Sequence, residues 1–270
     1  MSVETDRRIA QTIASEIGAR PDQVAATAAL LDAGATVPFV ARYRKEVTGG
    51  LDDTQLRTLA DRLGYLRELE SRRTTILGSI REQAKLTPEL EASIAAATSK
   101  AALEDLYLPY KPKRRTRAAV AREKGLGPLA EAILADRRTS PEKLAAPHVT
   151  EEVPDVKAAL AGARDILTEG LSEDALLLGR LRTFLQKNAV LTAKVVKGQE
   201  EKGAKFSDYF AYSERWAQAA SHRALAIMRG AGEGVLTLDI GPDPQTGAPQ
   251  VEAMVTAALG AAGSGAPGDL

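Results

Sequence analysis

Regularly spaced leucines between residues 53 and 85 constrain the fold of this chain more than any other feature. The apolar side chains recur at intervals of three and four residues, with one polar interruption: Leu56, Leu59, Leu63, Leu66, Leu77 and Ile80. Because positions three and four apart share one face of an α-helix, this spacing predicts a helix from Asp53 to Lys85. Such a helix is roughly 50 Å long at 1.5 Å per residue, and we expect other helices to pack against it.

The composition favours helices over most of the chain. Aromatic residues make up 4% of the sequence, whereas alanine and leucine are abundant, which favours helix packing over a β-sandwich. Two segments with β-branched alternation, 190–196 and 235–240, are predicted strands. We therefore predict a mainly α fold. It comprises a multi-helical domain with helix-turn-helix-like elements and a long central helix, plus a small β-containing C-terminal segment.

Capping residues mark the ends of the other predicted helices. Threonine, serine and proline favour the first turn of a helix, and glycine favours the position after its end. These signals predict helices at 5–17, 21–33, 38–45, 99–106, 116–124, 128–134, 155–169 and 172–188, and one beginning at 88. The helix at 172–188 carries an apolar stripe of Leu176, Leu177, Leu181, Phe184 and Leu185.

Two helix pairs are helix-turn-helix candidates. The first pair is joined by the turn DAGAT at residues 32–36. In the second pair, Ala121 supplies a small residue, Gly125 the turn and Leu126 an apolar residue, but Glu131 stands where an apolar core residue is usual. An ordinary helix hairpin is the alternative, and we favour it somewhat for the second pair.

We expect three parts along the chain. Residues 1–189 are predicted to form the helical domain, and residues 190–240 a small mixed segment. Residues 241–270 are rich in Gly, Ala and Pro, and we predict a low-complexity, disordered tail there. The last eleven residues, GAAGSGAPGDL, lack bulky side chains that could pack.

A basic connector follows the predicted helix at 99–106. Five of the seven residues from 111 to 117 are cationic, namely Lys111, Lys113, Arg114, Arg115 and Arg117. The whole chain, by contrast, has 36 basic and 36 acidic residues. Pro109 and Pro112 favour extended backbone before them, so these side chains are expected on an exposed segment suited to phosphate contact. A solvated loop without a ligand is an equally weighted alternative.

A smaller cationic group lies in the sequence FVARYRKEV. It contains Arg42, Arg44 and Lys45, with Tyr43 between them. On a continuous helix Arg42 and Lys45 share a face. The arginines are predicted to be either ion-pair partners or phosphate contacts, and we expect Tyr43 to pack inward rather than stack on a base.

The sequence offers no recognisable catalytic constellation. It has no cysteine, and its two histidines, His148 and His222, have no nucleophile or metal-ligand pattern around them. We predict no enzymatic activity, no catalytic residue, no cofactor and no metal. The N-terminal sequence MSVETDRRIAQ has no apolar signal core, and no apolar run approaches the length that spans a bilayer. We therefore expect a cytoplasmic protein with no membrane partner.

Four strings, in the same order, resemble the N-terminal region of the Tex family of bacterial transcription accessory proteins. They are TVPFVARYRKEVTGGLDDTQLRTL, LEDLYLPYKPKRRTRAAVAREKGLGPLAEAI, GAKFSDYF and SHRALAIMRG. The resemblance covers about residues 5–236, and we lose it after Gly241. It implies a largely helical, nucleic-acid-binding region linked to transcription. Family members continue into RNase-H-like, helix-hairpin-helix and OB-fold domains, so this chain is expected to be truncated before them.

The residues and the resemblance together predict a non-catalytic nucleic-acid-binding module of a transcription accessory protein. The expected partner is RNA or DNA, bound without regard to base sequence, with the transcription machinery as a further candidate. The alternative is a helical scaffold that braces other domains or docks on that machinery. Nucleic-acid binding requires the connector's cations to be exposed and free of acidic partners, whereas a scaffold would pair its arginines with Glu or Asp.

Overall fold

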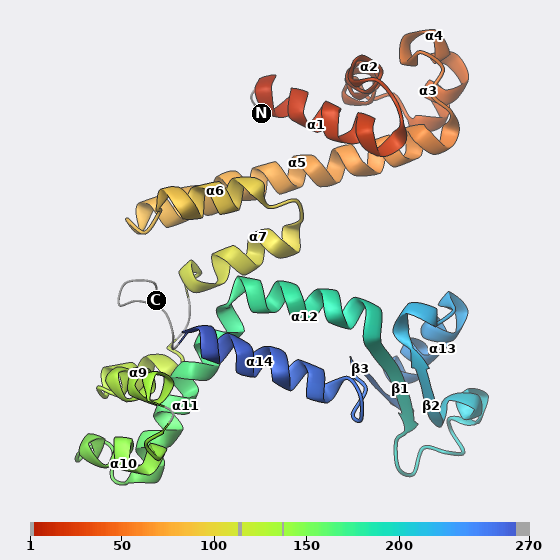
Figure 1. Cartoon of the computed structure of the whole chain (residues 1–270). Coiled ribbons are helices and arrows are strands. Elements are labelled where there is room, and N and C mark those ends of the chain that lie inside the picture. The colour runs from red at the N-terminus through yellow and green to blue at the C-terminus, as the bar shows by residue number, and fades with distance from the viewer. Residues whose placement is uncertain (1–2, 113–114, 137, 263–270) are drawn as a thin grey trace. The chain divides into compact units, whose positions relative to one another are not determined.

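Helices account for most of the fold, and one small sheet lies near the C-terminus (Figure 1). The structure is a computed structural model that describes residues 3–112, 115–136 and 138–262. Two compact units divide the chain, Met1–Tyr107 and Leu108–Leu270. The predicted mainly α class with a small β-containing C-terminal part is confirmed. The boundary between the units falls inside the segment that we expected to be a single helical domain.

Unit 1 consists of seven helices within its described residues. They are α1 (Val3–Ile17), α2 (Pro21–Asp32), α3 (Val37–Tyr43), α4 (Lys45–Thr48), α5 (Asp53–Glu82), α6 (Pro88–Ala96) and α7 (Lys100–Tyr107). The predicted spine is α5, with 30 residues and a length of about 45 Å. Helices α1, α2 and α3 pack on α5, as do α6 and α7.

The stripe of buried residues on α5 follows the predicted spacing. Its members are Leu56, Leu59, Leu63, Leu66, Leu69, Arg73, Ile76 and Ile80. Ile76 is buried where we expected Leu77, and Gly64 and Gly78 do not interrupt the helix. The helix begins with a capping box in which Asp52 accepts a hydrogen bond from the Gln55 amide at 2.8 Å.

One arginine occupies a core position of that stripe. Arg73 is 7% exposed, and its guanidinium donates to the backbone oxygens of Ile94 at 3.0 Å and Ala97 at 2.6 Å. A third donor pairs with Glu70, which also pairs with Arg8 of α1. Arg73 therefore supplies a donor to the Ala97 carbonyl just past the end of α6, and a second donor to the Ile94 carbonyl, which also accepts from the Ala97 amide at 3.3 Å.

Most predicted helix ends in unit 1 lie within a few residues of the observed ones. Thr87 caps α6 by accepting from the Leu90 amide at 3.2 Å, as expected. The first helix begins at Val3, so Thr5 lies inside it and is not its cap. The long helix ends at Glu82 rather than Lys85, because Ala84 takes a left-handed backbone with φ of 54°.

Unit 2 contains a helical cluster and a small sheet. The described helices are α8 (Arg117–Glu123), α9 (Gly127–Ala135), α10 (Pro141–Ala145), α11 (Val156–Glu173), α12 (Ala175–Asn188), α13 (Ser221–Gly232) and α14 (Ala248–Ala262). Short 3-10 turns are η1 (Leu108–Tyr110), η2 (Ala146–His148), η3 (Ala204–Tyr209) and η4 (Trp216–Gln218). Helices α8, α9 and α10 pack around α11.

The sheet is antiparallel and has the strand order β2-β1-β3. Its strands are β1 (Ala189–Val195), β2 (Ala211–Arg215) and β3 (Leu236–Pro242). In the register of the pairs, Leu191 lies opposite Glu214 on β2 and Ile240 on β3. Buried residues of β1 pack with Ile227 of α13 and Phe206 of η3, forming the core of this part. The predicted ends of β1 and β3 lie within two residues of the observed ends, whereas β2 was not predicted.

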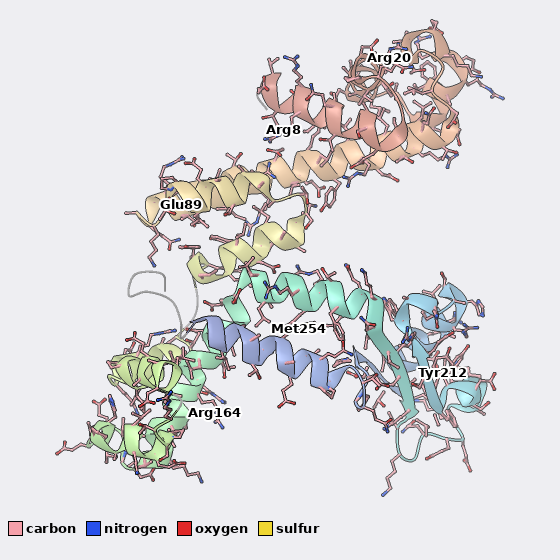
Figure 2. The ribbon with its side chains drawn as sticks, in the orientation of Figure 1. Arg8, Arg20, Glu89, Arg164, Tyr212 and Met254 are labelled. Atoms are coloured by element: carbon pink, nitrogen blue, oxygen red, sulfur yellow. The ribbon has the colours of Figure 1, made fainter. Side chains whose placement is uncertain are left out.

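Two expectations for unit 2 were wrong. Residues 248–262 form α14, where we expected a disordered tail. Met254 of α14 lies beside α12 residues such as Phe184, so the helix packs there (Figure 2). The boundary between α11 and α12 falls at Asp174, which caps α12, and not at Ser172. Within the expected apolar stripe of α12, Leu177 and Phe184 are buried but Leu176 is exposed.

Candidate nucleic-acid interface

The basic connector, residues 111–117, leads from η1 into α8. Thr116 caps α8 by accepting a hydrogen bond from the Ala119 amide at 3.0 Å, as predicted. Lys111, Arg115 and Arg117 are exposed. Lys113 and Arg114 lie outside the described residues.

The connector's arginines differ in their acidic partners. Arg115 pairs with Glu123 of α8 at 2.5 Å, and both side chains are exposed. Among the described residues, Lys111 and Arg117 form no ion pair with a carboxylate. The arrangement therefore combines two cations available to a polyanion with one cation that already has a partner.

A half-buried contact fixes the end of the connector to α11. The Thr116 hydroxyl donates to one oxygen of Glu169 at 2.8 Å, and Arg122 of α8 donates to the other oxygen at 2.5 Å. Glu169 belongs to α11, which is also packed against α8. This anchoring gives the cations that flank Thr116 a defined backbone position.

Replacing Glu123 should test whether its pair with Arg115 competes with phosphate. Glu123→Gln should release Arg115 and strengthen binding to duplex DNA by roughly eightfold at about 0.1 M salt, because each phosphate contact contributes about 0.9 decades per decade of salt. Stability should change by less than about 1 kcal/mol, since the pair is exposed. Fluorescence anisotropy at several salt concentrations measures the change. Unaltered binding would show that Arg115 does not reach phosphate.

The second cationic group lies where α3 meets α4. Arg42 and Lys45 are exposed, and in the part of the chain that the structure describes neither forms an ion pair. Arg44 lies between the two helices with φ of −133°, so the predicted continuous helix is broken there. Arg42 and Lys45 therefore do not share one helix face by α-helical spacing.

The aromatic residues of this segment are exposed rather than buried. Tyr43 is 55% exposed, which contradicts the expectation that it packs inward. Its ring centroid lies 5.4 Å from that of Phe39, which is 41% exposed. We overlooked Phe39, although its spacing of four residues from Tyr43 indicates a shared helix face.

Neither histidine takes part in a catalytic arrangement that the structure shows. His148 is half-buried in η2, and His222 is exposed in the first turn of α13. The described residues contain no group of three or more His, Asp or Glu side chains placed to hold a metal ion. None of the described helices combines the length and apolar character that crossing a bilayer requires.

A polar cluster joins β2 to α13 at the sheet (Figure 2). Arg223 donates to both oxygens of Glu214 at 3.1 and 2.6 Å, and the Tyr212 hydroxyl also donates to that carboxylate. The hydrogen bond from Tyr212, reinforced by Arg223, holds the pKa of Glu214 below its ordinary value. Glu214 thus remains ionised and ties strand to helix, which is a structural role.

Comparisons with known proteins identify the family. Residues 7–81 match the description "Tex-like protein N-terminal domain", and residues 136–270 match "Tex central region-like". The chain is 58% identical over 242 residues to Protein YhgF of Escherichia coli, covering 89% of this chain and 31% of that protein. It is 54% identical over 236 residues to the transcriptional accessory protein Tex of Neisseria gonorrhoeae, covering 87% and 31%.

A more distant relative is human. The S1 RNA-binding domain-containing protein 1 of Homo sapiens is 28% identical over 251 residues, covering 88% of this chain and 25% of that protein. The matches show that this chain belongs to the Tex family, as its sequence indicated. It spans about a third of the length of these bacterial relatives. The family pattern, which we expected to end after Gly241, continues to residue 270.

Proposed function

We propose that this chain is a non-catalytic nucleic-acid-binding module of a transcription accessory protein. The observation that best supports this proposal is the basic connector, whose Lys111 and Arg117 are exposed and have no carboxylate partner within the described residues. The name of the Neisseria gonorrhoeae relative supports a link to transcription, and that of the human relative supports a link to RNA. Such a module would act in the cytoplasm beside the transcription machinery.

Binding at the connector would depend on charge and not on base sequence. Lysine and arginine neutralise phosphates and release counterions, which supplies affinity without reading base edges. The proposed contacts are Lys111, Lys113, Arg114, Arg115 and Arg117 on the connector, and Arg42, Arg44 and Lys45 on unit 1. RNA and DNA both present the required phosphates, so the connector itself would accept either. The two helix pairs that we predicted as helix-turn-helix candidates need not enter a groove for this mode.

A scaffold is the second candidate function. It is favoured by the ion pairs Arg115–Glu123 and Arg122–Glu169, which engage basic side chains within unit 2. An apolar cavity of about 530 Å³ between α9, α11 and α14 also offers a surface for another protein element. Its lining includes Leu134, Ile166 and Leu259.

The salt dependence of binding tests the proposed function. The chain is titrated onto two labelled DNA duplexes of unrelated sequence at a series of salt concentrations. If the connector alone contacts the duplex, its five phosphate contacts predict a log–log slope of about −4.5, and four predict about −3.6 if Arg115 remains with Glu123. The two duplexes should bind equally. Absence of binding at low salt, or a strong preference for one sequence, would contradict the proposal.

A further inference from the structure

Two exposed aromatic side chains, Phe39 and Tyr43, form a patch on α3, and Val47 on the neighbouring helix α4 is exposed as well. Phe39 is 41% exposed, Tyr43 55% and Val47 43%. The two rings lie 5.4 Å apart between centroids and are tilted by 48°. Burying an aromatic ring is favourable, and neither of these rings is buried within the chain. Two adjacent exposed rings therefore indicate a binding surface.

The patch is edged by positive charge. Arg42 and Lys45 flank it in the sequence, and neither pairs with a carboxylate in the described ranges. Arg44 lies over the Phe39 ring at 5.2 Å and donates to the Tyr43 carbonyl at 2.9 Å. Together these residues, with Phe39 and Tyr43, are here called the α3–α4 surface. Glu46 is the single acidic residue in the segment from Phe39 to Thr48, so cations prevail.

The backbone beneath this surface is held firmly. The Gln23 amide of α2 donates to the carbonyl oxygens of Thr48 at 3.1 Å and Gly49 at 2.9 Å, where α4 ends. Gly49 has φ of 62°, and a Cβ there would lie 2.7 Å from the Gln23 amide nitrogen. Val40, in the same helix, is fully buried. The exposed rings therefore project from a fixed base and lose little freedom on binding.

We propose that the α3–α4 surface binds a single-stranded stretch of nucleic acid. Tyr43 stacks on an unpaired base, while Arg42 and Lys45 contact the flanking phosphates. Besides its proposed phosphate contact, Arg44 positions the platform through its contacts with Phe39 and the Tyr43 carbonyl. This inference rests on the proposed nucleic-acid function and adds a ligand class to it.

The strand must be unpaired because stacking requires an accessible base face. In a duplex both faces of each base are covered by its neighbours, so exposed rings gain nothing from it. A platform of aromatic rings among cations is the arrangement by which proteins bind single strands with little sequence preference. An acidic peptide would satisfy the charges, but it offers no aromatic face to match the paired rings.

The test compares single-stranded and duplex DNA on defined variants. Fluorescence anisotropy uses a labelled oligothymidylate of roughly a dozen nucleotides, close to one site size, and a duplex of equal length. Tyr43→Ala is compared with Tyr43→Phe, which keeps the ring, and with Val47→Ala, which removes exposed apolar area without a ring. Each is measured in the parent chain and in the Lys111→Ala/Arg117→Ala background, which reduces binding at the connector.

Tyr43→Ala should weaken single-strand binding by roughly 5- to 150-fold, the loss of one stacked base. The salt slope should stay the same, because no phosphate contact is removed. Duplex binding should not change, and both Tyr43→Phe and Val47→Ala should bind like the parent. Thermal unfolding by circular dichroism should be unaltered, since Tyr43 is more than half exposed.

Three outcomes would overturn this inference. If Tyr43→Ala retains full single-strand affinity while the Lys111→Ala/Arg117→Ala change abolishes binding, the proposed function stands without this site. Equal losses for Val47→Ala and Tyr43→Ala would indicate a general apolar contact, as a protein partner makes. No binding of either DNA by the parent would remove the proposed function and this inference together.

Discussion

Arg73→Leu should lower the free energy of unfolding of unit 1 by about 3 kcal/mol or more. The substitution removes a buried cation whose partners are Glu70 and the carbonyl oxygens of Ile94 and Ala97. The Ala97 carbonyl would lose its donor in a dry environment, and the Ile94 carbonyl would keep only the Ala97 amide at 3.3 Å. Glu70 would keep only its pair with the more exposed Arg8. Leucine and arginine have similar helix propensities, so the loss reports the contacts and not α5 itself.

Arg81→Leu is the matched control on the same helix. Its pair with Glu91 is 3.4 Å long, and the Arg81 side chain is 66% exposed. An exposed pair of this kind contributes little, and the control should cost less than about 1 kcal/mol. Urea unfolding followed by circular dichroism compares the two variants. The single tryptophan, Trp216, belongs to unit 2, so its fluorescence follows that unit separately. Equal midpoints for the two variants would contradict the structural role of Arg73.

The sequence allowed the spine to be predicted but not its most unusual contact. Leucine spacing determines which face of α5 is buried, so the helix and most of its core followed from periodicity. The polar interval between Leu66 and Leu77 read as an interruption, whereas Leu69, Arg73 and Ile76 continue the buried stripe. Nothing local shows that an arginine there reaches the end of α6, because its carbonyl partners lie 21 and 24 residues away.

The missed elements depended on partners distant in the chain. The strand β2 is short, and its charged residues fit a strand only because β1 supplies a partner. The helix α14 lay in a segment whose glycine and alanine content suggested disorder. Its apolar residues Val251, Met254, Val255 and Leu259 nevertheless recur at intervals of three and four, and this signal could have identified it.

The candidate interface was predictable in kind and not in detail. The clustered cations are visible in the sequence. Whether each cation is available to a phosphate depends on whether it pairs with a carboxylate, and tertiary structure determines those pairs. Glu123, at the end of α8, forms an ion pair with Arg115, whereas Arg117 has no such partner in the described part of the chain. The exposure of Tyr43 likewise depends on which face of α3 packs on α5, and propensity alone does not determine that face.

Lys111→Ala combined with Arg117→Ala should weaken duplex binding by roughly 60-fold at about 0.1 M salt and flatten the log–log slope by about 1.8. Both figures follow from the loss of two phosphate contacts at about 0.9 each. Folding should be unaffected. Lys111 is exposed, and Arg117 is the first residue of α8, where a cation opposes the helix dipole and alanine does not.

Lys157→Ala combined with Arg164→Ala is the matched control in the same unit. Both residues are exposed on α11, where Figure 2 labels Arg164, and Lys157 lies in the first turn of the helix. The control removes the same charge from the chain, so a change in net charge alone would lower binding equally in both double variants. A loss confined to the connector variant would locate the phosphate contacts there. If both double variants bind like the parent at every salt concentration, the connector is not the contact, and the scaffold function becomes the better account of its arginines.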